Sequence, residues 1–187
     1  HTNANRRTEH YHCYVVTDYF EGATTNANTN TVFSWFCWAR NTAPGGALAQ
    51  GLAREYHHTA TPRRFAVWVQ SKKLLVSVFD DQNDSIGKTT GEDFPTNAWS
   101  YVGFSYDDGP QSLTVYMNGA TQAVTDSGSG VFNGVSTNSI YLSRFGTFVG
   151  TGNYWSGDAD EQRYYGGVNP TDNQVTNQMF WTPPELG

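Results

Sequence analysis

The stretch GDADEQRYY at residues 157–165 combines three carboxylates, an arginine and two tyrosines. Asp158, Asp160 and Glu161 stand close enough in the chain for two kinds of chemistry. A pair of carboxylates can divide the roles of acid and nucleophile in glycoside hydrolysis, and several carboxylate oxygens can bind calcium. The third interpretation is the closing strand of a β-sheet with its polar edge exposed.

The strand interpretation accounts best for the spacing. Alternation along a strand places Asp160, Gln162 and Tyr164 on one face and Glu161, Arg163 and Tyr165 on the other. Asp158 then precedes the strand in a turn. Arg163 can pair with Glu161 or with an acidic residue of a neighbouring strand, and such a surface pair stabilises by at most about 1 kcal/mol. We therefore predict a strand here, and catalysis is the least favoured of the three interpretations.

The histidines offer a different chemistry. An N-terminal His1 can chelate copper through its amine and its ring when a second histidine completes the site. The available partners are His10, His12, His57 and His58. The polar start HTNANRR favours a flexible arm over a fixed face, so a copper site is an alternative and not the main prediction.

Two kinds of covalent modification are open to the chain. Cys13 and Cys37 fall in two candidate strands. In an oxidising compartment a bridge between them would close a loop of about 25 residues and stabilise by roughly 3 kcal/mol. The alternative is a pair of buried thiols. Asn83, in Asn-Asp-Ser, is the only acceptor for N-glycosylation in the sequence.

These side chains must be positioned by strands, because helix-period patterns are nearly absent. Short apolar or alternating runs are separated by Gly, Asn and Asp turns at spacings of about ten residues, which is typical of an all-β sandwich. The predicted strands are residues 11–16, 31–40, 64–70, 73–80, 99–107, 112–119, 139–145 and 160–165. One short helix is predicted at 169–180, with Asn169 or Thr171 as its cap. Eight strands suit two packed sheets.

The length of 187 residues supports one core and requires no second domain. We predict an N-terminal arm or first strand at 1–13, a single domain at 14–180 and a C-terminal tail at 181–187. The net charge of -6 and the absence of a Lys/Arg run argue against a nucleic-acid or membrane partner. A start at His1 instead of Met, with a polar, weakly charged composition, predicts a processed, extracellular protein.

Three segments together resemble a known superfamily. They are NAWSYVGFSYDDGPQSLTVYMNGATQAV at 97–124, IYLSRFG at 140–146 and YWSGDADEQRYYGGVNPTDNQV at 154–175. The residues that carry the likeness are, in chain order, Trp99, Tyr116, Asn118, Gly119, Gly146, Trp155, Gly157, Asp160, Glu161, Arg163 and Tyr165. This order is similar to that of laminin-G-like, or concanavalin A-like lectin–glucanase, jelly rolls. The resemblance covers most of 14–180 and implies a two-sheet antiparallel β-sandwich with one short C-terminal helix.

Enzymes of this superfamily carry motifs that the sequence lacks. Retaining glucanases use a Glu-x-Asp-x-Glu strand, whereas the nearest stretches here, 158–161 and 91–93, lack that spacing or lie in a turn. Alginate lyases combine Arg-x-Glu-x-Arg with Gln-x-His, and RRTEHYH at 6–12 matches only the first half of that set. A glycan-active hydrolase or lyase is therefore the third-ranked function.

A structural calcium ion is implied by the resemblance. In related jelly rolls it joins the acidic residue of the opening strand to the aspartate of the closing strand. Carried over to YFEG at 19–22 and to the closing strand, this names Glu21, the carbonyl of Gly22 and Asp160, on neighbouring strands. The acidic run DDQND at 80–84 has oxygen density for a cation too, but such runs are more often hairpin turns.

Glycan binding is the function that the aromatic content favours, because sugar rings stack on Trp and Tyr and are oriented by polar side chains. Trp35, Trp68 and Trp99 are assigned to the core. The ligand-binding candidates are Trp155, Tyr154, Asn153 and Arg144, although Trp155 can also be the buried aromatic that precedes the closing strand. We predict a secreted, non-catalytic glycan-binding or adhesive module with a carbohydrate or glycoprotein partner. The alternative is a structural subunit of an extracellular filament, coat or capsid, which self-associates through its arm and tail.

Overall fold

The computed structural model describes residues 20–24, 30–57, 63–135, 141–145, 154–167 and 169–179. Within these ranges the chain forms twelve strands and one helix. They are β1 (Phe20–Thr24), β2 (Val32–Asn41), β3 (Gln50–His57), β4 (Arg63–Gln70), β5 (Lys73–Phe79), β6 (Ser85–Asp93), β7 (Trp99–Asp107), β8 (Ser112–Met117), β9 (Ala120–Thr121), β10 (Val124–Asp126), β11 (Tyr141–Phe145), β12 (Gly157–Gly166) and α1 (Asp172–Met179). No helix among the described residues is long and apolar enough to cross a membrane.

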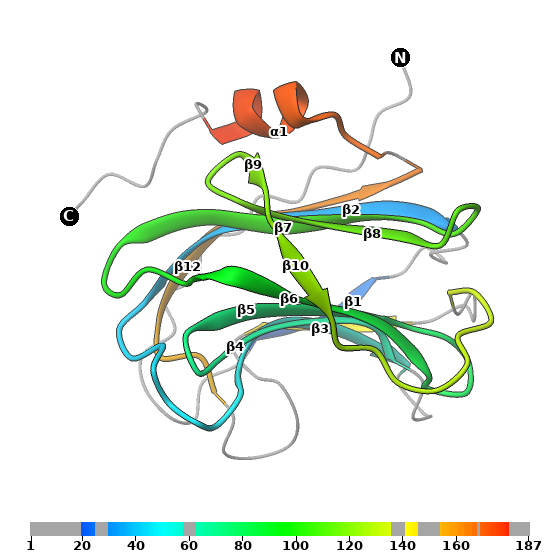
Figure 1. The fold of residues 1–187 in the computed structure, drawn as a ribbon, viewed down its shortest axis with the longest axis horizontal. Coiled ribbons are helices and arrows are strands. Elements are labelled where there is room, and N and C mark those ends of the chain that lie inside the picture. Colours follow the sequence, from blue (N-terminus) through cyan, green and yellow to red (C-terminus); the bar gives the residue numbers. More distant parts are fainter. Residues whose placement is uncertain are drawn as a thin grey trace.

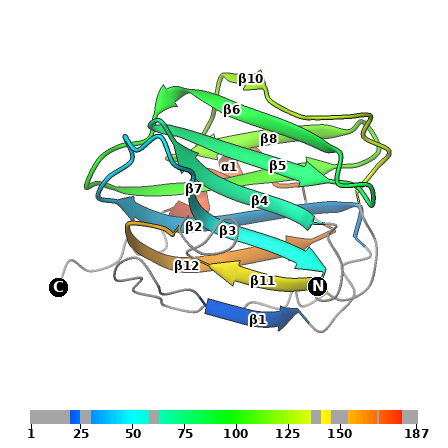
Figure 2. The same ribbon diagram turned by 90° about the horizontal axis from the view of Figure 1, so that it is seen from below.

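The strands form two antiparallel sheets that pack face to face (Figure 1). The seven-stranded sheet has the order β1-β11-β3-β4-β5-β6-β10, which is seen from below in Figure 2, and the five-stranded sheet has the order β12-β2-β7-β8-β9. Helix α1 lies over the outer face of the five-stranded sheet (Figure 1). The all-β, two-sheet fold with one short C-terminal helix is therefore confirmed.

The main core lies between the two sheets. In β2 the side chains of Phe33, Trp35 and Cys37 alternate inward and are fully buried. They meet inward residues of the other sheet, including Phe65, whose ring centroid lies 6.3 Å from those of both Phe33 and Trp35. Removing such a ring costs about 3–5 kcal/mol because a cavity remains, so these aromatics hold the two sheets together.

A second, smaller cluster joins α1 to the five-stranded sheet. Val175 of the helix is fully buried among the aromatic side chains Phe36, Trp38, Tyr101 and Tyr116. Thr171 caps the helix, because its backbone N–H donates to the Gln174 side chain at 2.8 Å and its hydroxyl accepts from the Gln174 N–H at 3.4 Å. The predicted helix and its cap at Thr171 are thus found, with the helix itself confined to α1.

Trp68 and Trp99 do not lie in the main core. Trp68 belongs to β4, between Val67 and Val69, which both point into the core, so it lies on the outer face and is half-buried. Trp99 packs against the smaller cluster, below the guanidinium of Arg40 at 5.6 Å. The core assignment is right for Trp35 and wrong for Trp68, because single tryptophans in alternating strands do not reveal which face is covered.

The strand β12 carries a bulge that the alternation rule does not predict. Its register with β2 shifts between Asp160 and Arg163, and Glu161 takes a positive φ of 49°. As a result Tyr164 turns inward and stacks on Phe33 at 6.0 Å between ring centroids. The expectation that Asp160 and Tyr164 share a face is therefore wrong.

Candidate functional site

The carboxylates of the 157–165 stretch are engaged in local contacts. Asp158 lies within β12, not in a turn, and accepts a hydrogen bond from the Arg40 Nε at 2.7 Å. Glu161 pairs with Arg163 at 2.5 Å, as predicted. Asp160 accepts the backbone N–H of the next residue at 2.7 Å. These contacts fit a closing strand.

Trp155 lies in the core and cannot stack on a ligand. Its side chain is 1% exposed, its indole N–H donates to the Asp158 carbonyl at 3.2 Å, and its ring meets Phe94 edge-on at 5.7 Å. The assignment of Trp155 as a ligand-binding residue is therefore wrong, and its alternative as the buried aromatic before the closing strand is confirmed. Tyr154, one residue earlier, stays half-buried at the surface.

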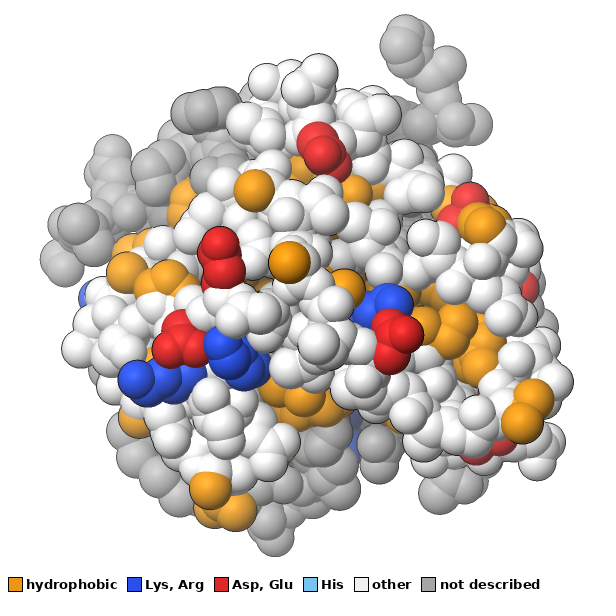
Figure 3. Space-filling view, in the orientation of Figure 1, with side chains coloured by type: hydrophobic (Ala, Val, Ile, Leu, Met, Phe, Trp, Pro, Cys, Tyr) orange, Lys and Arg blue, Asp and Glu red, His pale blue; other side chains and the backbone are white. Residues whose placement is uncertain are grey.

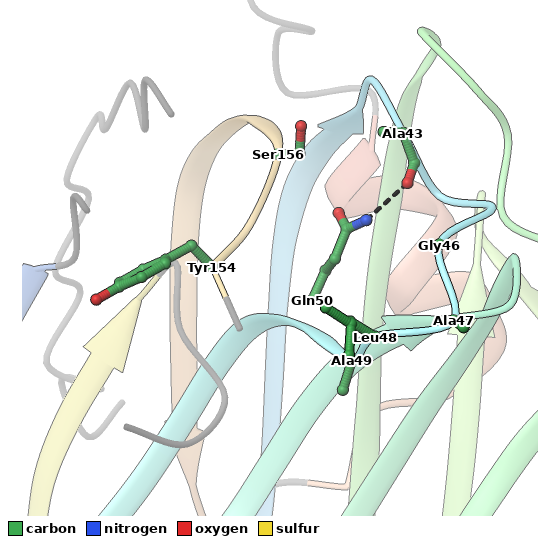
Figure 4. A pocket seen from close by; sticks show the side chains of 8 residues that line it. All are labelled: Ala43, Gly46, Ala47, Leu48, Ala49, Gln50, Tyr154 and Ser156. Atoms are coloured by element: carbon green, nitrogen blue, oxygen red, sulfur yellow. Dashed lines mark hydrogen bonds between the residues drawn. The ribbon is translucent and has the colours of Figure 1, made fainter. Parts of the chain in front are cut away.

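Tyr154 borders a hollow at the junction of two loops. One side is the β2–β3 connection, and the other is the segment that enters β12 (Figure 4). The hollow has a volume of about 400 Å³ and is lined by Ala43, Gly46, Ala47, Leu48, Ala49, Gln50, Tyr154 and Ser156. Sequence reasoning named only Tyr154 from this set, because a loop of alanines and glycines gives no signal of a binding surface.

Hydrogen bonds fix the two walls of the hollow to each other. The Thr42 N–H donates to the Ser156 carbonyl at 2.8 Å, and the two hydroxyls lie 2.9 Å apart. The fully buried Asn41 donates to the Gln50 Oε1 at 2.9 Å and accepts from the Ala43 N–H at 2.8 Å. The Gln50 Nε2 in turn donates to the Ala43 carbonyl at 2.6 Å. The amide of Gln50 is thus held in one orientation.

The far side of the same loop is tied to the β4–β5 hairpin. Three donors of the hairpin bond to loop carbonyls: Gln70 Nε2 to Ala47 at 2.8 Å, Ser71 N to Gly46 at 3.0 Å and Lys72 N to Pro44 at 2.7 Å. A loop bonded on both sides keeps its shape before a ligand arrives, which lowers the entropic cost of binding.

The chemistry of the hollow is uncharged. Among the described residues that line it, none is acidic or basic. Its polar groups are the Gln50 amide and two hydroxyls, and Figure 4 shows the Tyr154 hydroxyl directed away from Gln50. The rest of the wall is apolar, with Leu48 70% exposed. A surface with one aromatic ring and a few fixed polar groups suits a neutral polar ligand with an apolar face, such as a sugar ring.

The described residues that line the hollow do not include the other two ligand-binding candidates, Arg144 and Asn153. Arg144 lies in β11, where its register partners are Glu21 on one side and Arg54 on the other. Asn153 lies outside the described residues, as do His1 and Cys13.

The proposed calcium ligands lie in different sheets. Glu21 and Gly22 belong to β1 at an edge of the seven-stranded sheet, whereas Asp160 belongs to β12 at an edge of the five-stranded sheet. The expectation that these strands pair as neighbours is wrong. Among the described side chains, no group of three His, Cys, Asp or Glu residues is arranged to hold a metal ion.

The acidic run 80–84 forms a hairpin turn between β5 and β6. Asp80 is only 2% exposed, and its carboxylate accepts the backbone N–H groups of Gln82, Asp84 and Asn133 at 2.9, 2.9 and 3.0 Å. Its oxygens therefore serve the turn, in agreement with the turn interpretation. Asn83 is exposed in this turn with a φ of 66°, and its glycosylation stays a prediction.

Cys37 is a buried free thiol of β2. Burial, and secondarily the charge of Asp160, raises the pKa of this thiol well above its usual range. Such a thiol stays protonated near neutral pH, and a protonated thiol is a weak nucleophile and a weak metal ligand. The bridge to Cys13 stays a prediction.

The strand order defines a two-sheet β-sandwich, and an open hollow lies between two loops at its surface. Residues 13–175 match the laminin-G-like family of the concanavalin A-like lectin/glucanases superfamily, and the chain belongs to this family. A search of curated proteins finds no sequence match.

Solved structures share the fold at low sequence identity. The CBM40 domain of the Ruminococcus gnavus IT-sialidase, bound to α2,3-sialyllactose, is 12% identical with a TM-score of 0.60, over 80% of this chain and 83% of that chain. The receptor-binding domain of botulinum neurotoxin type G is 12% identical with a TM-score of 0.59, over 88% and 45%. A heptameric SAP-like pentraxin from Limulus polyphemus is 12% identical with a TM-score of 0.58, over 79% and 69%. The chain spans less than half the length of the toxin domain, and these similarities show the fold alone.

Proposed function

We propose that the chain is a secreted, non-catalytic glycan-binding module whose ligand site is the hollow beside Tyr154. The observation that carries the proposal is the composition of this hollow: one aromatic ring, a fixed amide and a hydroxyl on an uncharged, hydrogen-bonded frame. Sugars require this combination, because their C–H faces stack on aromatic rings while their hydroxyls need donors and acceptors.

The family and the fold support this function. One solved structure with the same fold is a domain bound to α2,3-sialyllactose, and another is a receptor-binding domain. The surface supports an extracellular setting, because the described charged side chains are scattered over the face shown in Figure 3 and uncharged groups dominate it. The proposal also includes a structural calcium ion and self-association through the N-terminal arm and the C-terminal tail. Neither is required for a ligand to bind in the hollow.

A glycan array followed by titration calorimetry tests the proposal. The Tyr154→Ala variant should bind the selected neutral glycan about tenfold more weakly, because an aromatic contact contributes about 1.5 kcal/mol. The control is Val131→Ala, which removes an exposed apolar side chain outside the hollow. Binding that is unchanged in Tyr154→Ala, with both variants folded, would contradict the placement of the site.

A further inference from the structure

Two Asn-Gly pairs occur in the sequence, Asn118-Gly119 and Asn133-Gly134. In such a pair the backbone nitrogen of the glycine can attack the side-chain amide carbon of the asparagine. A C–N bond forms, the C–NH2 bond breaks, and the NH2 group leaves as ammonia with the proton of the glycine nitrogen. Water then opens the resulting five-membered succinimide ring at either carbonyl, which yields an aspartate or an isoaspartate. The reaction consumes only water.

The fold restrains the first of these pairs. Asn118 lies in the turn between β8 and β9 with a φ of 53°, and its Oδ1 accepts the Tyr101 backbone N–H at 3.0 Å. Its own backbone N–H donates to the Tyr101 carbonyl at 2.7 Å. Tyr101 is fully buried, so a rotation of the Asn118 side chain would take this acceptor away from a buried N–H donor, which is costly.

The second pair lies at the surface. Asn133 is exposed and belongs to the extended segment 131–135, outside the strands. Its Nδ2 donates to the Val131 carbonyl at 2.8 Å, and water can replace either partner of this exposed bond. The Asn133 side chain therefore rotates toward the Gly134 nitrogen at a lower cost than the Asn118 side chain rotates toward that of Gly119.

The fold also requires a glycine after Asn133. Gly134 has a φ of 100°, a conformation that residues with side chains disfavour, and a Cβ there would lie 3.2 Å from the Asp108 Oδ2. Glycine is also the residue whose nitrogen attacks most readily, because no side chain shields it. The backbone conformation at Gly134 thus retains the reactive pair in an exposed segment.

We propose that Asn133 is a site of spontaneous deamidation whose isoaspartate product loosens the 131–135 segment. The Asn133 N–H donates to Asp80 at 3.0 Å, and the Val135 N–H donates to Asp108 at 2.9 Å. An isoaspartate adds a methylene group to the backbone between these two donors, so their spacing no longer matches the two carboxylates. The new carboxylate also lies close to the charge of Asp80, and like charges repel.

The segment that loosens covers part of the core. Phe132 packs edge-on against Tyr106 at 6.1 Å between ring centroids, and Val135 is only 6% exposed. Deamidation therefore weakens this end of the sandwich as the protein ages. The described lining of the hollow includes none of these residues, so the inference does not depend on glycan binding.

The test is incubation of the intact chain in mildly alkaline buffer, followed by digestion at acid pH and peptide mass mapping. Replacement of NH2 by OH raises the peptide mass, and chromatography separates isoaspartate from aspartate. We expect Asn133 to react at least about tenfold faster than Asn118, because only Asn118 must abandon a buried donor. The same chain unfolded in urea is the control, and there the two rates should be similar. Equal rates in the folded chain, or no reaction at Asn133, would overturn the inference.

Hydrogen exchange tests the consequence of the modification. After incubation the Val131 and Val135 amides of the parent chain should exchange faster, in proportion to the isoaspartate content. Asn133→Gln should keep its protection, because glutamine would have to form a six-membered ring and reacts far more slowly. Asn173→Gln, the same change at an exposed position of α1, is the matched control and should lose protection as the parent does. An equal loss of protection in Asn133→Gln would show that deamidation is not its cause and would overturn the second part of the inference.

Discussion

At the scale of single residues, two core tyrosines differ in what their hydroxyls do, although Tyr106 is fully buried and Tyr164 only partly. The Tyr164 hydroxyl is buried and has no hydrogen-bond partner among the residues that the structure describes, whereas the Tyr106 hydroxyl donates to Asp108 at 2.6 Å. Tyr164→Phe should therefore raise the free energy of unfolding by about 1 kcal/mol, because a desolvated, unpaired group is removed. Tyr106→Phe should lower it by about 1–3 kcal/mol, because the charged acceptor loses its donor.

Urea unfolding of both variants beside the parent chain measures this difference. Both substitutions remove one hydroxyl and retain the ring, so each serves as the control for the other. Equal losses of stability in the two variants would show that the Tyr164 hydroxyl is stabilising after all.

The positions of Tyr154, Trp155 and Gln50 show which features of the hollow the sequence does not reveal. Tyr154 was predicted because an aromatic in a Gly-rich segment stands out, yet its neighbour Trp155 was placed wrongly at the surface. Adjacent residues point in opposite directions, and only the packing of Phe94 decides which of the two rings is buried. Nothing in the sequence indicates that Gln50 lines the hollow, because its orientation depends on a hydrogen bond from Asn41 that forms only in the fold.

At the scale of elements, an extended segment is held by carboxylates in place of a strand. The backbone N–H groups of Val131, Asn133 and Val135 donate to Asp84, Asp80 and Asp108 at 3.3, 3.0 and 2.9 Å. Asp80→Asn should lower the free energy of unfolding by about 1–3 kcal/mol, because an amide cannot accept all three bonds of this carboxylate.

Hydrogen exchange measures the loss of these backbone-to-carboxylate hydrogen bonds more specifically than unfolding does. The Asn133 amide should exchange faster in Asp80→Asn, while amides of the central strand β4 keep their protection. Asp126→Asn is the control: its side chain is 86% exposed and its surface ion pair with Lys88 contributes at most about 1 kcal/mol, so the exchange of the Asn133 amide should not change. Uniform acceleration at all amides would mean that Asp80 stabilises the whole fold and not this segment.

The strands were predictable where burial of one face requires apolar and polar residues to alternate along the chain. The β7 bounds agree with the prediction, and β2 differs by one residue at each end. The strands β3 and β6 were missed because QGLAREYH and SIGKTTGED are poor in β-formers, and pairing on both sides supplies what propensity lacks. The bulge in β12 has no sequence signal, since Glu161 is an ordinary residue at an unusual φ.

At the scale of the whole molecule, the sandwich buries several groups that ionise only at high pH. Burial raises the pKa of the Cys37 thiol and of the phenols of Tyr101, Tyr106 and Tyr164, with the Asp108 hydrogen bond a further cause at Tyr106. In the unfolded chain the same groups ionise near about 8.5 for Cys and about 10 for Tyr. The folded state thus holds its protons to higher pH than the unfolded state does.

The free energy of unfolding depends on pH because the folded and unfolded states bind different numbers of protons. Below the unfolded pKa values both states are protonated and the stability is fully present; above them only the unfolded chain loses protons, so stability falls as pH rises toward the folded pKa values. We expect the free energy of unfolding to be steady near about pH 7 and to decline steeply above about pH 9 to 10. Guanidinium unfolding at a series of pH values measures this decline, and Tyr164→Phe should make it shallower because one of these groups is gone. A stability that is constant up to about pH 11, or an equally steep decline in Tyr164→Phe, would show that these side chains are not shielded from water in the folded sandwich.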